Sequence, residues 1–105
     1  QTALLNTREE RARLHDKWAR KGLEANMRGE VAAAATCFGE AVKLERRTTT
    51  LLSLINMQLK MGEHTLAAAA YLRLMESNVL NEREWAMAQA KLYEANVSLV
   101  KRAAE

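Results

Sequence analysis

The sequence predicts an all-α fold of antiparallel helical hairpins, about five helices in all, and three observations support this. Proline is absent and glycine occurs only four times in 105 residues, a composition typical of helices. The segment from Trp18 to Leu44 contains two apolar, alanine-rich runs hinged at Met27-Arg28-Gly29-Glu30. The same pattern returns thirty-three residues later, which indicates a repeat array.

Five positions carry the repeat, and each has a counterpart of similar character at the same offset. The pairs are Trp18 and Leu51, Gly29 and Gly62, Ala34 and Ala67, Phe38 and Tyr71, and Ala41 and Leu74.

The first hairpin is expected to begin at Thr7, which has capping-box spacing to Glu10, with Asn6 as an alternative cap. Its first helix should run to Met27, and Gly29 should close it in the left-handed conformation. The second helix is expected over 30–46, with Gly39 relieving crowding at a helix crossing. The expected buried side of the first helix comprises Leu14, Trp18, Gly22, Ala25 and Met27.

The second hairpin should follow a turn at the threonine cluster 48–50, because β-branched hydroxyl residues prefer caps to helix interiors. A third helix then runs to Met61, and Gly62 ends it. The fourth helix is expected over 63–76, and the loop 77–81 leads into a last helix, capped at Asn81 and running toward Ala103 without a turn at Asn96. The apolar residues expected inward on these last two helices are Leu66, Ala67, Ala70, Tyr71, Leu74, Trp85, Ala88, Leu92, Ala95 and Leu99.

Composition and charge limit the classes of function that the chain can have. The net charge of +3 comes from 16 basic and 13 acidic residues, and the basic stretch 8–21 is interrupted by acidic residues without aromatic interleaving. A nucleic-acid contact is therefore only a distant alternative. No apolar run reaches the roughly 20 residues of a membrane span, and the single Cys37 favours a reducing, cytoplasmic or other intracellular compartment. The chain does not begin with Met, so we interpret it as part of a longer protein.

The sequence contains no motif typical of an enzyme active site. His15, His64 and Cys37 lack metal-ligand spacing, and neither a nucleophile–base motif nor a phosphate-binding glycine loop occurs. We therefore expect no catalytic residues, no metal and no cofactor.

The chain resembles the tetratricopeptide repeat family. The family's pattern is carried in the first repeat by Trp18, Gly22, Gly29, Ala34, Phe38 and Ala41, and in the second by Leu51, Leu54, Gly62, Ala67 and Tyr71. Ile55 stands where the second repeat would have its small first-helix residue, and no Pro closes either repeat. The resemblance implies a short right-handed α-solenoid. Its parts are a flexible lead 1–6 and one domain 7–105, with repeats 15–47 and 48–81 and a capping helix 82–104.

The resemblance also implies a protein–protein interaction adaptor or scaffold that binds a peptide or helical segment on the concave face made by the first helix of each pair. The residues expected on that face are Asp16, Ala19, Leu23, Asn26, Met27, Thr49, Leu52, Asn56, Leu59, Lys60, Arg83, Ala86, Ala90 and Tyr93. Those expected to bind the peptide are Leu23, Asn26, Met27, Leu52, Asn56, Leu59, Lys60, Arg83 and Tyr93, with acidic groups on the partner. Leu23 replaces the Asn of the chaperone-binding members, so a carboxylate clamp is not expected. The alternative is a self-association module of a larger structural protein.

Overall fold

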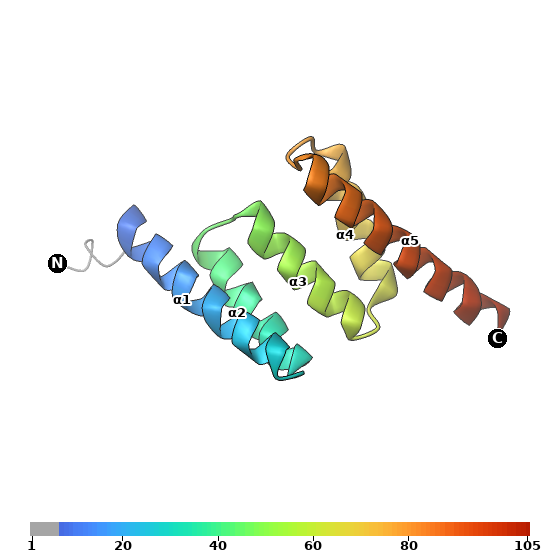
Figure 1. Ribbon diagram of the computed structural model, residues 1–105, viewed down its shortest axis with the longest axis horizontal. Coiled ribbons are helices and arrows are strands. Elements are labelled where there is room, and N and C mark those ends of the chain that lie inside the picture. Colours follow the sequence, from blue (N-terminus) through green and yellow to red (C-terminus); the bar gives the residue numbers. More distant parts are fainter. Residues whose placement is uncertain (1–6) are drawn as a thin grey trace. The chain divides into compact units, whose positions relative to one another are not determined.

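A computed structural model describes residues 7–105 and contains five α-helices over that range (Figure 1). They are α1 (Arg8–Met27), α2 (Val31–Leu44), α3 (Thr48–Lys60), α4 (His64–Glu76) and α5 (Glu82–Ala104). No strand occurs among the described residues, so the predicted all-α class with five helices is confirmed. The predicted lead 1–6 and the alternative cap Asn6 lie outside the described residues.

Helices α1 and α5 begin at the side-chain caps that the sequence predicts, Thr7 and Asn81. The Thr7 hydroxyl accepts from the Glu10 N–H at 3.1 Å, but Glu10 pairs with Arg13 instead of returning a bond to Thr7. The capping box at α5 is complete, because Asn81 accepts from the Glu84 N–H at 2.8 Å and donates its own N–H to Glu84 at 3.0 Å. α5 then continues as one helix past Asn96.

The two glycine turns have the same hydrogen bonds. After α1, Gly29 has φ +79° and Glu30 donates its N–H to the Ala25 carbonyl at 2.9 Å. After α3, Gly62 has φ +86° and Glu63 donates to Gln58 at 3.0 Å. This is the Schellman closure of a helix, which requires a left-handed residue.

The connection between the hairpins differs from the prediction. The turn lies at Glu45–Arg47, and the three threonines form the first turn of α3. The Leu51 N–H donates to the Arg47 carbonyl at 3.0 Å, so the helix winds from Thr48. A first turn tolerates threonine because its backbone N–H groups have no intrahelical partners that a side chain could displace.

The chain divides into two compact units, unit 1 (Gln1–Leu54) and unit 2 (Ile55–Glu105), and the boundary falls inside α3. In unit 1, α1 and α2 pack along each other around Ala25, Ala34, Phe38 and Ala41, all at most 2% exposed. A Cβ placed on Gly22 would lie 2.7 Å from Phe38 Cε1, so only glycine allows the ring this close to the α1 backbone.

Gly39 does not relieve crowding, since a Cβ there would meet nothing within 4 Å, and that prediction was wrong. Met27, expected near the buried side, is 86% exposed because α1 ends there.

In unit 2, α4 packs along α5, and the core contains Met57, Tyr71, Leu74, Ala88 and Ala95. Leu66 and Trp85 were expected to point inward, but they are 49% and 41% exposed. Both lie in the first turn of their helices, where a neighbouring helix covers less of the surface.

Candidate functional site

The nine predicted peptide-binding residues divide between the two units. In unit 1, Leu23 is 54% exposed and Met27, one turn further along α1, is 86% exposed, while Asn26 is half-buried. Leu52 is only 5% exposed, so its side chain belongs to the core and offers little area to a partner. Of these four, Leu23 and Met27 together present an apolar surface.

In unit 2, Lys60 and Arg83 are exposed, and Tyr93 is 71% exposed. Leu59 is 7% exposed and part of the core. Asn56 is half-buried, and its Oδ1 is buried without a hydrogen-bond partner among the described residues.

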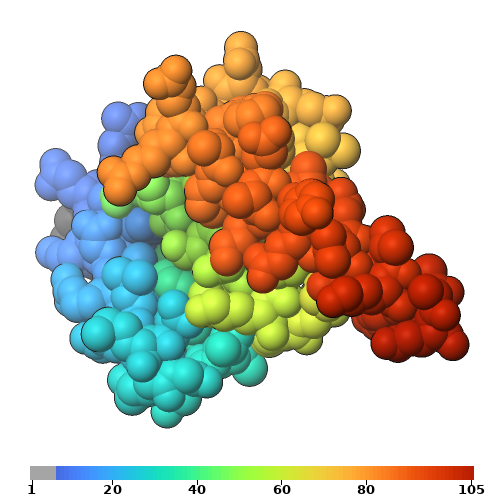
Figure 2. All heavy atoms as spheres, turned by 45° about the vertical axis from the view of Figure 1, so that its right-hand side comes forward, coloured from blue at the N-terminus to red at the C-terminus, as the bar shows by residue number. Residues whose placement is uncertain are grey.

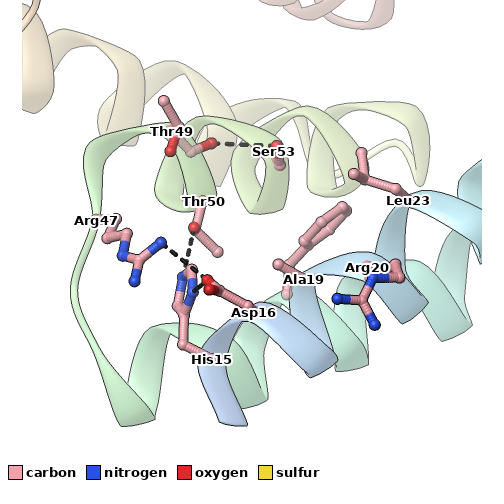
Figure 3. Close-up of a pocket in the computed structure, with 10 residues that line it drawn as sticks. His15, Asp16, Ala19, Arg20, Leu23, Arg47, Thr49, Thr50 and Ser53 are labelled. Atoms are coloured by element: carbon pink, nitrogen blue, oxygen red, sulfur yellow. Dashed lines mark hydrogen bonds and ion pairs between the residues drawn. The ribbon is translucent and has the colours of Figure 1, made fainter. Parts of the chain in front are cut away.

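A pocket of about 360 Å³ lies in unit 1, between α1 and the first turns of α3. Figure 3 shows its polar end around His15, Asp16 and Thr50, with Leu23 at the other end of the α1 wall. The lining residues are His15, Asp16, Ala19, Arg20, Leu23, Phe38, Arg47, Thr49, Thr50 and Ser53. Asp16, Ala19, Leu23 and Thr49 among them are residues that the sequence predicts on a binding face.

The polar end is a chain of hydrogen bonds that joins α1 to α3. His15 Nδ1 lies 3.0 Å from Asp16 Oδ1, and His15 Nε2 lies 2.8 Å from Thr50 Oγ1. A carboxylate only accepts, so Nδ1 donates to Asp16, and Nε2 of a neutral ring then accepts from the Thr50 hydroxyl. His15 and Thr50 are 2% and 5% exposed, so both buried polar groups have partners inside unit 1.

Arg47 extends the chain from the α2–α3 connection. Its Nη1 donates to Asp16 Oδ1 at 2.9 Å, and its Nε donates to Glu45. The hydrogen bond from His15, and then the charge of Arg47, hold the pKa of Asp16 below its usual range. The hydrogen bond to Glu45 raises the pKa of Arg47. Asp16 and Arg47 are therefore a fixed, fully charged pair at neutral pH.

The rest of the pocket is mainly apolar, with one further cation. Ala19 and Leu23 line it from α1, and Phe38 lines it from α2. Arg20 is exposed and forms no ion pair within the described residues, unlike Arg47. The pocket thus offers an apolar surface beside a guanidinium that can take a ligand's acidic group.

No local pattern in the sequence marks the contact between His15 and Thr50, which lie thirty-five residues apart. An available signal was the spacing of His15 with Trp18, Gly22 and Ala25, which places the imidazole on the buried side of α1. Nothing comparable marks Arg20, because its place in the pocket depends on the packing of α1 against the start of α3.

Over residues 7–105, no group of three or more His, Cys, Asp or Glu could hold a metal ion. Among the same residues no helix has both the length and the apolar composition that a bilayer span needs. Comparison of the chain with protein-family models, with curated proteins and with solved structures gives no significant match.

Proposed function

We propose that the chain is a protein-interaction module of the tetratricopeptide-repeat kind, and that the pocket of unit 1 binds an extended segment of a partner protein. The segment would present an apolar side chain next to an acidic one. The observation that supports this most is the exposed Leu23 beside Arg20, which forms no ion pair within residues 7–105, in the pocket between α1 and α3. The free thiol of Cys37 fits a reducing intracellular compartment.

A peptide segment suits the site better than a small molecule, because the apolar surface continues beyond the pocket. Met27 lies one turn past Leu23 on α1 and is 86% exposed. A ligand that covers both side chains must extend outside the pocket lining, of which Met27 is not a member.

The charge of the pocket favours an acidic group on the partner. Asp16 is already paired with His15 and Arg47 through its Oδ1. Arg20 then provides a cation that pairs with no acidic group in the described part of the chain, and guanidinium groups bind carboxylates in a two-pronged geometry.

The network of His15, Asp16, Thr50 and Arg47 has a structural role in this proposal. It fixes the first turn of α3 against α1, so the polar wall is already ordered before a ligand arrives. Preorganisation lowers the entropy cost of binding. The exposed Lys60 and Arg83 of unit 2 stay predicted contacts that the pocket does not require. The same holds for Asn56, whose Oδ1 has no hydrogen-bond partner among the described residues.

The test is selection of binders from a displayed library of random peptides, followed by calorimetry with the selected peptides as synthetic ligands. We expect enrichment of an apolar residue within two positions of Asp or Glu. Leu23→Glu should weaken binding about thirtyfold or more, since truncating a desolvated anchor costs about 2 kcal/mol. Arg20→Ala should weaken binding of the acidic peptides severalfold and leave peptides with a neutral residue at that position unaffected.

The matched control is Leu72→Glu on α4, because Leu72 is 46% exposed and does not line the pocket. This control should bind like the parent. Failure of the library to yield a binder, or equal loss with Leu23→Glu and Leu72→Glu, would contradict the pocket as the binding site.

A further inference from the structure

The last helix carries a second apolar face, which packing within unit 2 leaves mostly exposed, with only Val97 half-buried. The residues of this face, here called the α5 stripe, are Ala86, Ala90, Tyr93, Val97, Val100 and Ala104. They are spaced alternately by four and three, the repeat of a helix that pairs with another helix in a coiled coil. Tyr93 is 71% exposed and Val100 is 69% exposed.

The α5 stripe lies opposite the face that packs in unit 2. The buried residues of α5 are Ala88 and Ala95, both 0% exposed. At about 100° per residue they lie roughly half a turn around the helix from Tyr93 and Ala86. In Figure 2 the last turns of α5, in red, project beyond α4, so this end of the stripe is open to solvent. Packing in the core of unit 2 therefore does not explain why the α5 stripe is apolar.

We propose that the α5 stripe is a self-association surface, on which α5 of a second copy of this chain packs in antiparallel orientation. This goes beyond peptide binding by unit 1, and no residue of the stripe lines the pocket there.

Side-chain size along the stripe favours the antiparallel orientation. Its N-terminal part holds the small residues Ala86 and Ala90, whereas Tyr93, Val97 and Val100 follow. Antiparallel pairing sets the small end of one helix against the large side chains of the other. The distance between the two helix axes then stays nearly constant along the interface. Parallel pairing would instead set alanine against alanine next to tyrosine against tyrosine, which leaves gaps in the interface.

Charge favours the same arrangement and a second copy as the partner. The first turn of α5 contains Glu82 and Glu84 with Arg83 between them, two acids to one base, and the last turn contains Lys101 and Arg102. In an antiparallel pair each acidic end lies near the basic end of the other copy, and a two-fold axis repeats the contact. In the middle of the helix, Lys91 pairs with Glu94 at 3.6 Å, so that carboxylate is locally compensated.

This proposal gives two of the predicted peptide-binding residues a role in self-association instead. Tyr93 lies within the interface between copies, and Arg83 lies at its edge. Substitutions on the stripe should therefore change association without changing ligand binding in the pocket of unit 1.

Sedimentation equilibrium of the full chain over a wide concentration range tests the association. The parent should show a reversible monomer–dimer equilibrium, and Tyr93→Arg should weaken it at least tenfold, because the substitution places a charge in the middle of the interface. The control is Leu66→Arg on α4, an apolar residue 49% exposed in the same unit, and it should dimerise like the parent. Circular dichroism should show equal helix content in all three proteins.

Cysteine cross-linking tests the orientation, in a Cys37→Ser background. A mixture of the Ala86→Cys and Val97→Cys variants should form the mixed disulfide faster than either variant alone forms its own. A chain that stays monomeric up to millimolar concentration would overturn the proposal. So would a dimer that tolerates Tyr93→Arg, or one that Leu66→Arg disrupts. Efficient disulfides within each single variant would overturn the antiparallel pairing.

Discussion

Unit 1 and unit 2 place an aromatic ring at the same step of the repeat, but they accommodate it in different ways. In unit 1 the Phe38 ring lies against Gly22, where a Cβ would come within 2.7 Å. In unit 2 the buried Ile55, 4% exposed, stands at the position matching Gly22, and Tyr71 is fully buried. The Tyr71 hydroxyl has no hydrogen-bond partner among the described residues. One repeat pattern thus supports a close backbone approach in one unit and a side-chain-filled core in the other.

The two units also expose different side chains. Close packing of α1 on α2 in unit 1 leaves Leu23 and Arg20 exposed beside the pocket. The most exposed aromatic of unit 2, Tyr93, lies on the outer face of α5. Each unit therefore has its own candidate interaction surface.

Removing the ring should have the largest effect in both units. Phe38→Ala and Tyr71→Ala should each lower the free energy of unfolding by about 3–5 kcal/mol, measured by urea denaturation. Phe38→Ala should cost more, because Gly22 has no side chain that can fill the cavity, whereas Tyr71→Ala also removes an unpaired hydroxyl. A variant within about 1 kcal/mol of the parent would contradict the assignment of that ring to the core.

High pH should destabilise unit 2 through Tyr71. Burial, and to a lesser extent the charge of Glu94, raise the pKa of Tyr71 from 10.0 to about 12. Between these pH values the unfolded chain has lost the phenolic proton and the folded chain has not, so stability falls as pH rises. The loss should reach about 2–3 kcal/mol, measured by urea unfolding at about pH 9 and about pH 12.

Tyr71→Phe is the control for this pH effect, since it keeps the ring and removes the ionising group. The difference between the two pH values should shrink by the amount assigned to Tyr71. An unchanged pH dependence in this variant would show that other groups cause it.

Adding a methyl group at Gly22 should destabilise unit 1. Glycine to alanine in a helix normally stabilises by about 1 kcal/mol, but here the new Cβ would clash with a buried ring. We expect a net loss of about 1–3 kcal/mol in thermal or urea unfolding. Combining Gly22→Ala with Phe38→Leu should cost less than the sum of the two single changes, because the smaller side chain removes the clash. Full additivity would contradict the contact.

The smallest effect is expected at Gly39, where the direction is reversed. A Cβ at this position would meet nothing within 4 Å, so Gly39→Ala should stabilise the chain by about 0.5–1 kcal/mol. Thermal unfolding of Gly39→Ala beside Gly22→Ala tests whether the two helical glycines differ as the packing around them requires. Loss of stability at Gly39 would indicate a close contact that this structure lacks.

Local signals in the sequence predict the helices and most of their ends. Gly29 and Gly62 mark the left-handed closures, and Asn81 with Glu84 marks the start of α5, because these signals act within a few residues of the backbone they cap. The threonines 48–50 were misplaced because a propensity against helix interiors does not exclude the first helical turn.

Packing between helices sets which side of each helix is covered, and this in turn sets where the candidate sites lie. The bond of His15 to Thr50 and the pocket beside Arg20 depend on the packing of α1 against the start of α3. The exposure of Leu23 and Tyr93 and the burial of Leu52 and Leu59 likewise depend on neighbours distant in sequence. The spacing of apolar residues along the sequence shows that a helix has an apolar face. Only packing against another segment removes that face from water.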